Sequence, residues 1–179
     1  MELSELTKKT LELFKTDDIN RLSEKIMSCV LENNIDIYQS FKKLVDDLSV
    51  DWLQTIYQYY LSDRKNKMQD YTPKTLAILL GELAMDESDG KVVDMCAGSG
   101  ALTIQLWALN HDLEFECLEF DENVIPILLF NLSLRNIKAT VKRMDVLEND
   151  IEEVYEVEPQ EEFGKVVKIS EYSYQQSAL

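Results

Sequence analysis

The chain has 179 residues, a hydrophobic share of 45%, three cysteines and a formal net charge of −16. This length allows one full domain, or a helical segment followed by a small α/β domain. The acidic excess excludes nonspecific DNA binding by the whole surface, although a local basic patch stays compatible with it. No apolar run approaches the roughly 20 residues of a membrane helix, and the widely spaced cysteines give no disulfide framework, so we expect a cytoplasmic protein that does not bind membranes.

The first 66 residues predict a helical region. Apolar residues recur at spacings of three and four through residues 3–14, 19–31, 37–48 and 52–61, which is typical of amphipathic helices. Asp17-Asp18 fits a helix start, and Asn33-Asn34 fits a stop. Further along, Thr72 predicts the N-cap of another helix with Pro73 at its first position.

From Lys91 onward the pattern changes to alternating strands and helices. Strands are predicted at 91–95, 115–120 and 139–144, with helices at 102–109 and 123–136 between them. Two such crossovers imply a parallel sheet with right-handed connections. A short fourth strand is predicted at 166–169. The intervening stretch from Asp145 to Glu162 has nine acidic residues and no basic one, and we expect its carboxylates around the substrate mouth.

A small-residue turn, Ala97-Gly98-Ser99-Gly100, separates the first of these strands from its helix. Glycines let a backbone approach a ligand without a Cβ collision, and the following helix directs its amino-terminal amides to the same place. Glu119 stands 19 residues after Gly100, at the end of the next strand, where a carboxylate can accept both hydroxyls of a ribose. The sequence therefore predicts a nucleotide-type site at this turn.

The residues around the turn favour one class of cofactor. The nicotinamide fingerprint requires a small residue three positions after Gly100, and this chain has Thr103 there. An acid at the end of each of the first two strands is typical of S-adenosylmethionine methyltransferases, and Asp94 with Glu119 fits that pair. The alternative is a surface loop whose acids only cap it.

Four segments carry a resemblance to a known family: QDYTPKTLAILLGEL, VVDMCAGSGALTI, CLEFDENVIPILLFNLSLRNI and VKRMDVL. Over residues 67–147 the chain resembles the N6-adenine DNA methyltransferases, in particular the methylase subunit of type I restriction–modification systems. The first motif of that family often reads D-P-A-C-G-S/T-G. The corresponding residues here run from Asp94 to Gly100 as DMCAGSG, so the proline is absent and the Cys and Ala are exchanged.

The resemblance implies a Rossmann-like S-adenosylmethionine-dependent methyltransferase fold with a shortened parallel sheet. Together with the helical pattern of the first residues and the polar composition of the last ten, it predicts a helical region at 1–66, a partial Rossmann-like domain at 67–169 and a flexible tail at 170–179. It also implies a role for each matching position. These roles place Tyr71, Thr72 and Pro73 over the methionine moiety of the cofactor; Asp94, Ala97, Gly98 and Gly100 at its amino-acid end; Glu119 on the ribose; Phe120 on the adenine ring; and Asp145 with Val146 at the adenine amino group. Each has a structural alternative: Asp145 as a turn cap, Tyr71 in the core and Phe120 buried by packing.

One part of the family pattern is absent from this sequence. Adenine methylation needs a flipped base, and in the family an Asn/Asp-Pro-Pro-aromatic segment holds it. After Asp145 the chain has one proline, Pro159, in the sequence VEPQE, and only 34 residues in all. We therefore identify no catalytic residue and expect weak or absent methyl transfer by the isolated chain. The short sheet also predicts a partner chain or a second copy at the open edge of strand 166–169.

Three functions remain open at this point. The first is a cofactor-binding member of the family that methylates DNA adenine, with DNA reached through a partner subunit. The second is a non-catalytic relative that serves as a regulator or protein-interaction module. The third is a small-molecule or protein methyltransferase that shares only the cofactor half. The missing segment favours the second over the first for the isolated chain, and the Tyr71-Thr72-Pro73 segment favours both over the third.

Overall fold

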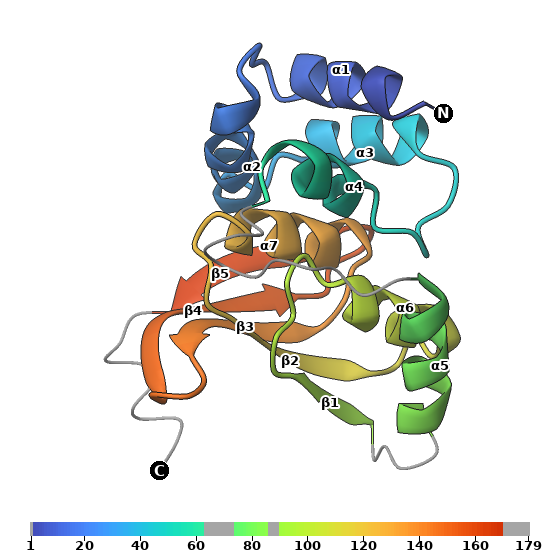
Figure 1. Cartoon of the computed structure of the whole chain (residues 1–179), viewed down its shortest axis with the longest axis vertical. Helices are drawn as coiled ribbons and strands as arrows, with labels where there is room; N and C mark the ends of the chain where they lie inside the picture. The colour runs from blue at the N-terminus through green and yellow to red at the C-terminus, as the bar shows by residue number, and fades with distance from the viewer. Residues whose placement is uncertain (1, 63–73, 86–89, 170–179) are drawn as a thin grey trace.

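Five strands form one sheet, and helices cover one side of it (Figure 1). A computed structural model of the chain describes residues 2–62, 74–85 and 90–169. The helices are α1 (Leu3–Leu13), α2 (Leu22–Leu31), α3 (Ile35–Leu44), α4 (Trp52–Tyr60), α5 (Lys74–Met85), α6 (Ala101–Leu109) and α7 (Ile125–Leu134), with a short 3-10 turn at Ile19–Arg21. The strands are β1 (Lys91–Asp94), β2 (Glu114–Glu119), β3 (Ala139–Asp145), β4 (Asp150–Glu158) and β5 (Lys165–Ile169).

Polar caps fix where the amino-terminal helices begin. The side chain of Asn34 accepts a hydrogen bond from the amide of Ile37 at the start of α3. The side chain of Asp51 does the same for the amide of Gln54 at the start of α4. Such caps satisfy amides that have no partner inside the helix. The helical prediction for the first part of the chain is therefore confirmed.

The first three strands follow the predicted topology. β1 pairs with β2 and β2 with β3, both in parallel, and α6 and α7 form the two crossovers. Because β1, β2 and β3 are adjacent and parallel, their carboxyl ends meet at one edge of the sheet. The turn after β1 and the acid at the end of β2 therefore lie at the same edge.

The rest of the sheet is antiparallel, which the sequence interpretation did not include. β4 turns back from β3 as a hairpin, and β5 pairs antiparallel with β4. β4 occupies residues within the acidic stretch that was expected to surround the substrate mouth. Tyr155 and Val157 are buried on one face of this strand, while Glu156 and Glu158 are exposed on the other, so these two carboxylates lie along its solvated face. Arg143 pairs with Glu152 and Glu153, and Lys168 also pairs with Glu153.

α7 lies between the amino-terminal helices and the sheet (Figure 1). All ten of its residues are buried, which fits a helix that is apolar around its whole circumference. Phe130 of α7 stacks on Tyr38 of α3 at a ring-centroid distance of 4.9 Å, and Tyr38 stacks in turn on Phe163. One hydrophobic core therefore extends from α1–α4 through α7 to the sheet.

The domain boundaries predicted at 66/67 and 169/170 lie at residues outside the described ranges or at their margin, so that division stays a prediction. Within the described ranges, no helix has the length and hydrophobicity needed to cross a membrane.

Candidate functional site

The small-residue turn has the tight conformation that its glycines predict. Gly98 has φ of 54° and Gly100 has φ of 92°, both in the left-handed region that side chains disfavour. The amide of Gly100 donates to the carbonyl of Ala97 at 2.8 Å, and Gly100 then forms the N-cap of α6. A Cβ at Gly100 would lie 2.9 Å from Leu128 Cδ1, so α7 packs closely against the turn.

Asp94 ends β1 and is turned inward beneath the turn. Its carboxylate accepts a hydrogen bond of 2.9 Å from the hydroxyl of Thr103 in the first turn of α6. Burial raises the pKa of Asp94, while the Thr103 hydroxyl and the amides of Cys96 and Thr103 act in the opposite direction. Asp94 therefore anchors α6 to β1 through the hydroxyl of Thr103. Thr103 is also the residue that stands where the nicotinamide fingerprint requires a small residue.

Glu119 ends β2 and faces the turn directly. Its Oε2 accepts a hydrogen bond of 2.7 Å from the amide of Gly98, and its Oε1 accepts one of 2.7 Å from the amide of Asp121. Burial raises the pKa of Glu119, and these amides oppose that rise. Each carboxylate oxygen has two acceptor positions, so both oxygens keep capacity for further donors such as ribose hydroxyls.

Two other predicted residues lie beside this contact. Ala97 is buried, and its amide donates to the carbonyl of Leu118 at 2.9 Å, which continues the pairing between β1 and β2 into the turn. Phe120 is 59% exposed, so its structural alternative, burial by packing, does not hold. An exposed ring next to Glu119 has a free face on which another ring can stack.

Asp145 and Val146 lie in the hairpin turn between β3 and β4. Asp145 ends β3, and its Oδ1 accepts from the amides of Leu147 and Glu148 at 2.9 and 3.3 Å. This is the capping role that stood as its structural alternative. Because β2 and β3 are parallel, Asp145 still lies at the same edge of the sheet as Glu119. Tyr71, Thr72 and Pro73 lie outside the described residues.

Three residues near the turn were missed by the sequence analysis. The side chain of Asn131 in α7 donates to the carbonyl of Ser99 at 2.9 Å, and also to Asp51 Oδ1 at 2.9 Å. Arg135 lies one helical turn further along and is 5% exposed. The three missed residues are Asp51, Asn131 and Arg135. The sequence feature that could have indicated two of them is the presence of an Asn and an Arg within the otherwise apolar segment IPILLFNLSLRNI.

The structure also has a hollow that is not part of this site. It has a volume of about 280 Å³ and is lined by the amino ends of β2 and β3 and by the end of β4, among them Glu114, Lys138 and Glu158. These strand ends are opposite the edge that carries Glu119. The hollow is therefore separate from the turn.

A glycine turn after the first parallel strand, with an acid of the second strand hydrogen-bonded to it, defines the class: a Rossmann-like α/β fold with a nucleotide-type turn at the carboxyl ends of its parallel strands. The sequence model of the family described as N-6 DNA Methylase matches residues 48–177, which is more than half of the chain. The protein therefore belongs to the N-6 DNA methylase family. No curated protein sequence matches the chain significantly.

Two solved structures are similar to this chain. One is a protein from Listeria monocytogenes assigned to the class I S-adenosylmethionine-dependent methyltransferases; it is 15% identical, with a TM-score of 0.44, over 79% of this chain and 54% of that protein. The other is the methyltransferase subunit of a type I restriction-modification system from Streptococcus thermophilus; it is 18% identical, with a TM-score of 0.43, over 83% of this chain and 37% of that protein. The chain thus spans 54% and 37% of the lengths of these two proteins.

Proposed function

We propose that the chain binds S-adenosylmethionine at the glycine turn. The observation that carries this proposal is the hydrogen bond between Glu119 Oε2 and the amide of Gly98. It places a carboxylate that can accept ribose hydroxyls beside a glycine backbone that a ligand can approach closely. The proposed contacts are those implied by the family resemblance: Tyr71, Thr72 and Pro73 over the methionine moiety; Asp94, Ala97, Gly98 and Gly100 at the amino-acid end; Glu119 on the ribose; and Phe120, Asp145 and Val146 around the adenine.

The described residues fit this cofactor, and Asp94 supports the site from below. Gly98 and Gly100 keep the turn free of side chains, Glu119 has acceptor capacity left, and the Phe120 ring is exposed. Asp94 is buried and held by Thr103, so it supports the turn from below. We propose that it acts on the amino-acid end mainly by fixing the amides above it.

The cofactor would supply a methyl group on a sulfonium. The family points to the N6 amino group of DNA adenine as the acceptor. The residues that follow Asp145 lack the Asn/Asp-Pro-Pro-aromatic segment that would receive a flipped adenine. We propose that this chain binds the cofactor and does not transfer the methyl group alone. A role as a non-catalytic regulator within a larger assembly is the second candidate.

A partner chain or a second copy is part of this proposal. Within the described ranges β1 and β5 are the two edge strands, and the edge predicted from sequence was that of β5. The β1 edge has the stronger features. The carbonyl of Gly90 accepts from the amide of Glu114. In a parallel pair every second residue of a strand bonds to its neighbour, so Val93, which is an odd number of positions from Gly90, directs its amide and carbonyl away from β2.

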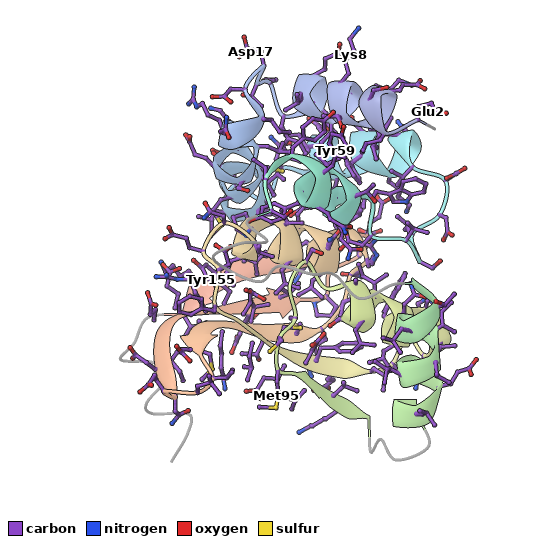
Figure 2. All side chains as sticks on the ribbon, viewed as in Figure 1. Glu2, Lys8, Asp17, Tyr59, Met95 and Tyr155 are labelled. Atoms are coloured by element: carbon purple, nitrogen blue, oxygen red, sulfur yellow. The ribbon has the colours of Figure 1, made fainter. Side chains whose placement is uncertain are left out.

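The surroundings of β1 are apolar and exposed. Val93 and Met95 are 57% and 59% exposed, and the side chain of Met95 projects beyond β1 on the side away from α1–α4 (Figure 2). α5 packs on α6 and exposes a stripe of leucines at helical spacing, namely Leu76, Leu79, Leu80 and Leu83. Exposed apolar surface of this kind marks contact sites for other chains. We propose that DNA is reached through such a partner, in the cytoplasm.

Calorimetry with S-adenosylmethionine tests the site. Glu119→Ala should weaken binding by tenfold or more, on the order of one lost charge-assisted hydrogen bond. Glu114→Ala is the matched control, because it removes the same side chain from the opposite end of β2. Absence of binding by the unaltered chain would overturn the proposal.

Methyl transfer is tested separately with radiolabelled cofactor and adenine-containing DNA. The isolated chain should transfer no label above background. Robust labelling of adenine would contradict the proposed lack of transfer by the isolated chain and leave the cofactor site intact.

A further inference from the structure

A chain of buried polar side chains connects the amino-terminal helices to the glycine turn. Asn131 of α7 lies at its centre and is 1% exposed. One amide group of Asn131 donates both to Asp51 Oδ1 and to the carbonyl of Ser99, each at 2.9 Å. Asp51 is the N-cap of α4, and Ser99 lies between the two glycines of the turn. Asn131 therefore links two segments that are 48 residues apart in the sequence.

Arg135 holds the other side of Asn131. Its Nη1 donates to Asn131 Oδ1 at 3.1 Å and to the Asn131 carbonyl at 2.8 Å. Its Nε and Nη2 donate to the carbonyls of Leu48 and Val50 at 2.6 and 2.8 Å. Arg135 thereby fixes both the orientation of the Asn131 amide and the path of the segment that leads into α4.

The charges in this network are buried and separated. Asp51 and Arg135 are 6% and 5% exposed, and the Asn131 side chain is bonded to both of them. Burial raises the pKa of Asp51, which the amide of Gln54 and the charge of Arg135 oppose, and burial lowers the pKa of Arg135 to about 10. Asp51 Oδ1 accepts from the amide of Gln54 and from Asn131, whereas Asp51 Oδ2 is buried with no hydrogen-bond partner among the described residues. The Asn131 contact is therefore one of two hydrogen bonds that compensate this buried carboxylate.

A second contact reaches the other half of the site. The hydroxyl of Tyr57 in α4 donates to Asp121 Oδ2 at 3.4 Å, and the amide of Asp121 donates to Glu119 Oε1. The glycine turn and the loop after Glu119 are thus both connected to α4, the turn through the N-cap Asp51 and the loop through Tyr57. The hydrogen bond from Asn131 orients the carbonyl of Ser99, which an apolar contact could not do because apolar contacts are not directional.

We propose that Asn131, held by Asp51 and Arg135, positions the glycine turn, so that the amino-terminal helices set the affinity of the cofactor site. Asn131 is a positioning residue here: it acts through the carbonyl of Ser99 and does not itself reach the ligand. This inference rests on the proposed binding of S-adenosylmethionine at that turn. It predicts that loosening the helical region at Asp51 alters a site whose contacting residues are unchanged.

Hydrogen exchange of the ligand-free protein tests the positioning directly. The amide of Gly100 reports on the turn, and that of Cys117 in the middle of β2 reports on the sheet. In Asn131→Ala the protection of Gly100 relative to Cys117 should fall about tenfold, the order expected when a buried acceptor loses its donor. Asp51→Ala should change the ratio in the same direction. Asp51→Asn keeps an acceptor for both Gln54 and Asn131 and should restore it.

Phe41→Leu is the control for general loosening of the helical layer. Phe41 packs edge-on against Phe130 of α7 at a centroid distance of 5.2 Å, and it is not part of the polar network. It should lower the thermal midpoint without changing the ratio of Gly100 to Cys117 protection. If Asn131→Ala does not fold, Asp51→Ala and Asp51→Asn carry the test.

Calorimetry with S-adenosylmethionine completes the test. The dissociation constant should rise about tenfold in Asn131→Ala and Asp51→Ala and stay unchanged in Phe41→Leu and Asp51→Asn. An unchanged exchange ratio in the folded Asn131 or Asp51 alanine variant overturns the positioning role. If the unaltered chain does not bind the cofactor, the proposed function fails, while the exchange ratio still decides whether Asn131 positions the turn.

Discussion

Glu119 Oε2 lies 2.7 Å from the backbone amide of Gly98, so the acid that ends β2 is hydrogen-bonded to the turn that ends β1. The same carboxylate accepts the amide of Asp121 through its other oxygen. One side chain therefore holds both loops at the carboxyl edge of the sheet. Without Glu119, the two amides would have to turn to water, and both loops would lose their shared anchor.

The burial of this carboxylate predicts how stability depends on pH. Because burial raises the pKa of Glu119, the native protein binds more protons than the unfolded chain between its ordinary value, about 4.3, and its native value. The free energy of unfolding should therefore fall as pH rises through that window. Glu119→Gln should make the fall less steep, as measured from urea midpoints at a series of pH values from 4 to 8.

Glu114→Gln is the control for that series. The Lys138 ammonium lowers the pKa of Glu114, so this carboxylate contributes with the opposite sign, and its contribution is lost as pH falls. Glu114→Gln should therefore not make the fall of the free energy of unfolding with rising pH less steep. Equal slopes in Glu119→Gln and the unaltered protein would show that Glu119 is not the group that titrates.

Much of the fold was predictable because its signals are local. The strand before the turn, the two glycines and the apolar runs of α6, β2 and α7 are each readable within a short window, and the structure confirms them. β4 was missed because its carboxylates obscure the buried Val154 and Val157. Arg143 lies in the preceding strand and Lys168 in the following one, so the acidic stretch contains neither of the cations that pair with it.

The site was only partly predictable for a related reason. Asp94 and Glu119 could be identified as acids that end adjacent strands. The roles of Asn131 and Arg135 could not, because the partners of Asn131 are 32 and 80 positions away and those of Arg135 include Leu48, 87 positions away. Such contacts exist only once α7 is packed between the helical region and the turn.

Gly100→Ala should destabilise the protein by about 1–3 kcal/mol, because a non-glycine residue is strained at φ of 92° and the new methyl would meet Leu128. Gly90→Ala is the matched control. Gly90 has φ of 99°, but a Cβ there would have no atom within 4 Å, so the control carries the backbone strain without the clash. Chemical denaturation of both variants measures the difference. A smaller loss in Gly100→Ala than in Gly90→Ala would contradict close packing of the turn on α7.

Thr103→Val should cost about 1–3 kcal/mol of unfolding free energy, because the buried carboxylate of Asp94 loses its hydroxyl donor while the side-chain volume is kept. Thr103→Ser keeps the hydroxyl and should be closer to the unaltered protein. Thermal unfolding of the two variants compares them. If valine and serine at this position had equal effects, the hydrogen bond to Asp94 would have no measurable part in holding α6.

Val93→Lys should weaken association with another chain while leaving the fold intact. Val93 is 57% exposed and belongs to the edge strand β1, and a lysine on an edge strand disfavours the addition of another strand. Sedimentation velocity over a range of protein concentrations should show self-association of the unaltered chain that is reduced in this variant. Circular dichroism and the thermal midpoint should be unchanged, because Val93 is not part of the buried core.

Val167→Lys on β5 distinguishes the two edges of the sheet. Val167 pairs with Glu156 on one side only, since β5 is the last strand in the order observed for residues 90–169. If association is lost in Val167→Lys and kept in Val93→Lys, the partner adds at β5, as the sequence pattern alone predicted. A second pair of variants, Leu79→Lys and Leu83→Lys, extends the test to α5. Loss of association in these together with Val93→Lys would place the contact along β1 and the exposed leucines, whereas a monomer at all concentrations would contradict self-association through either edge.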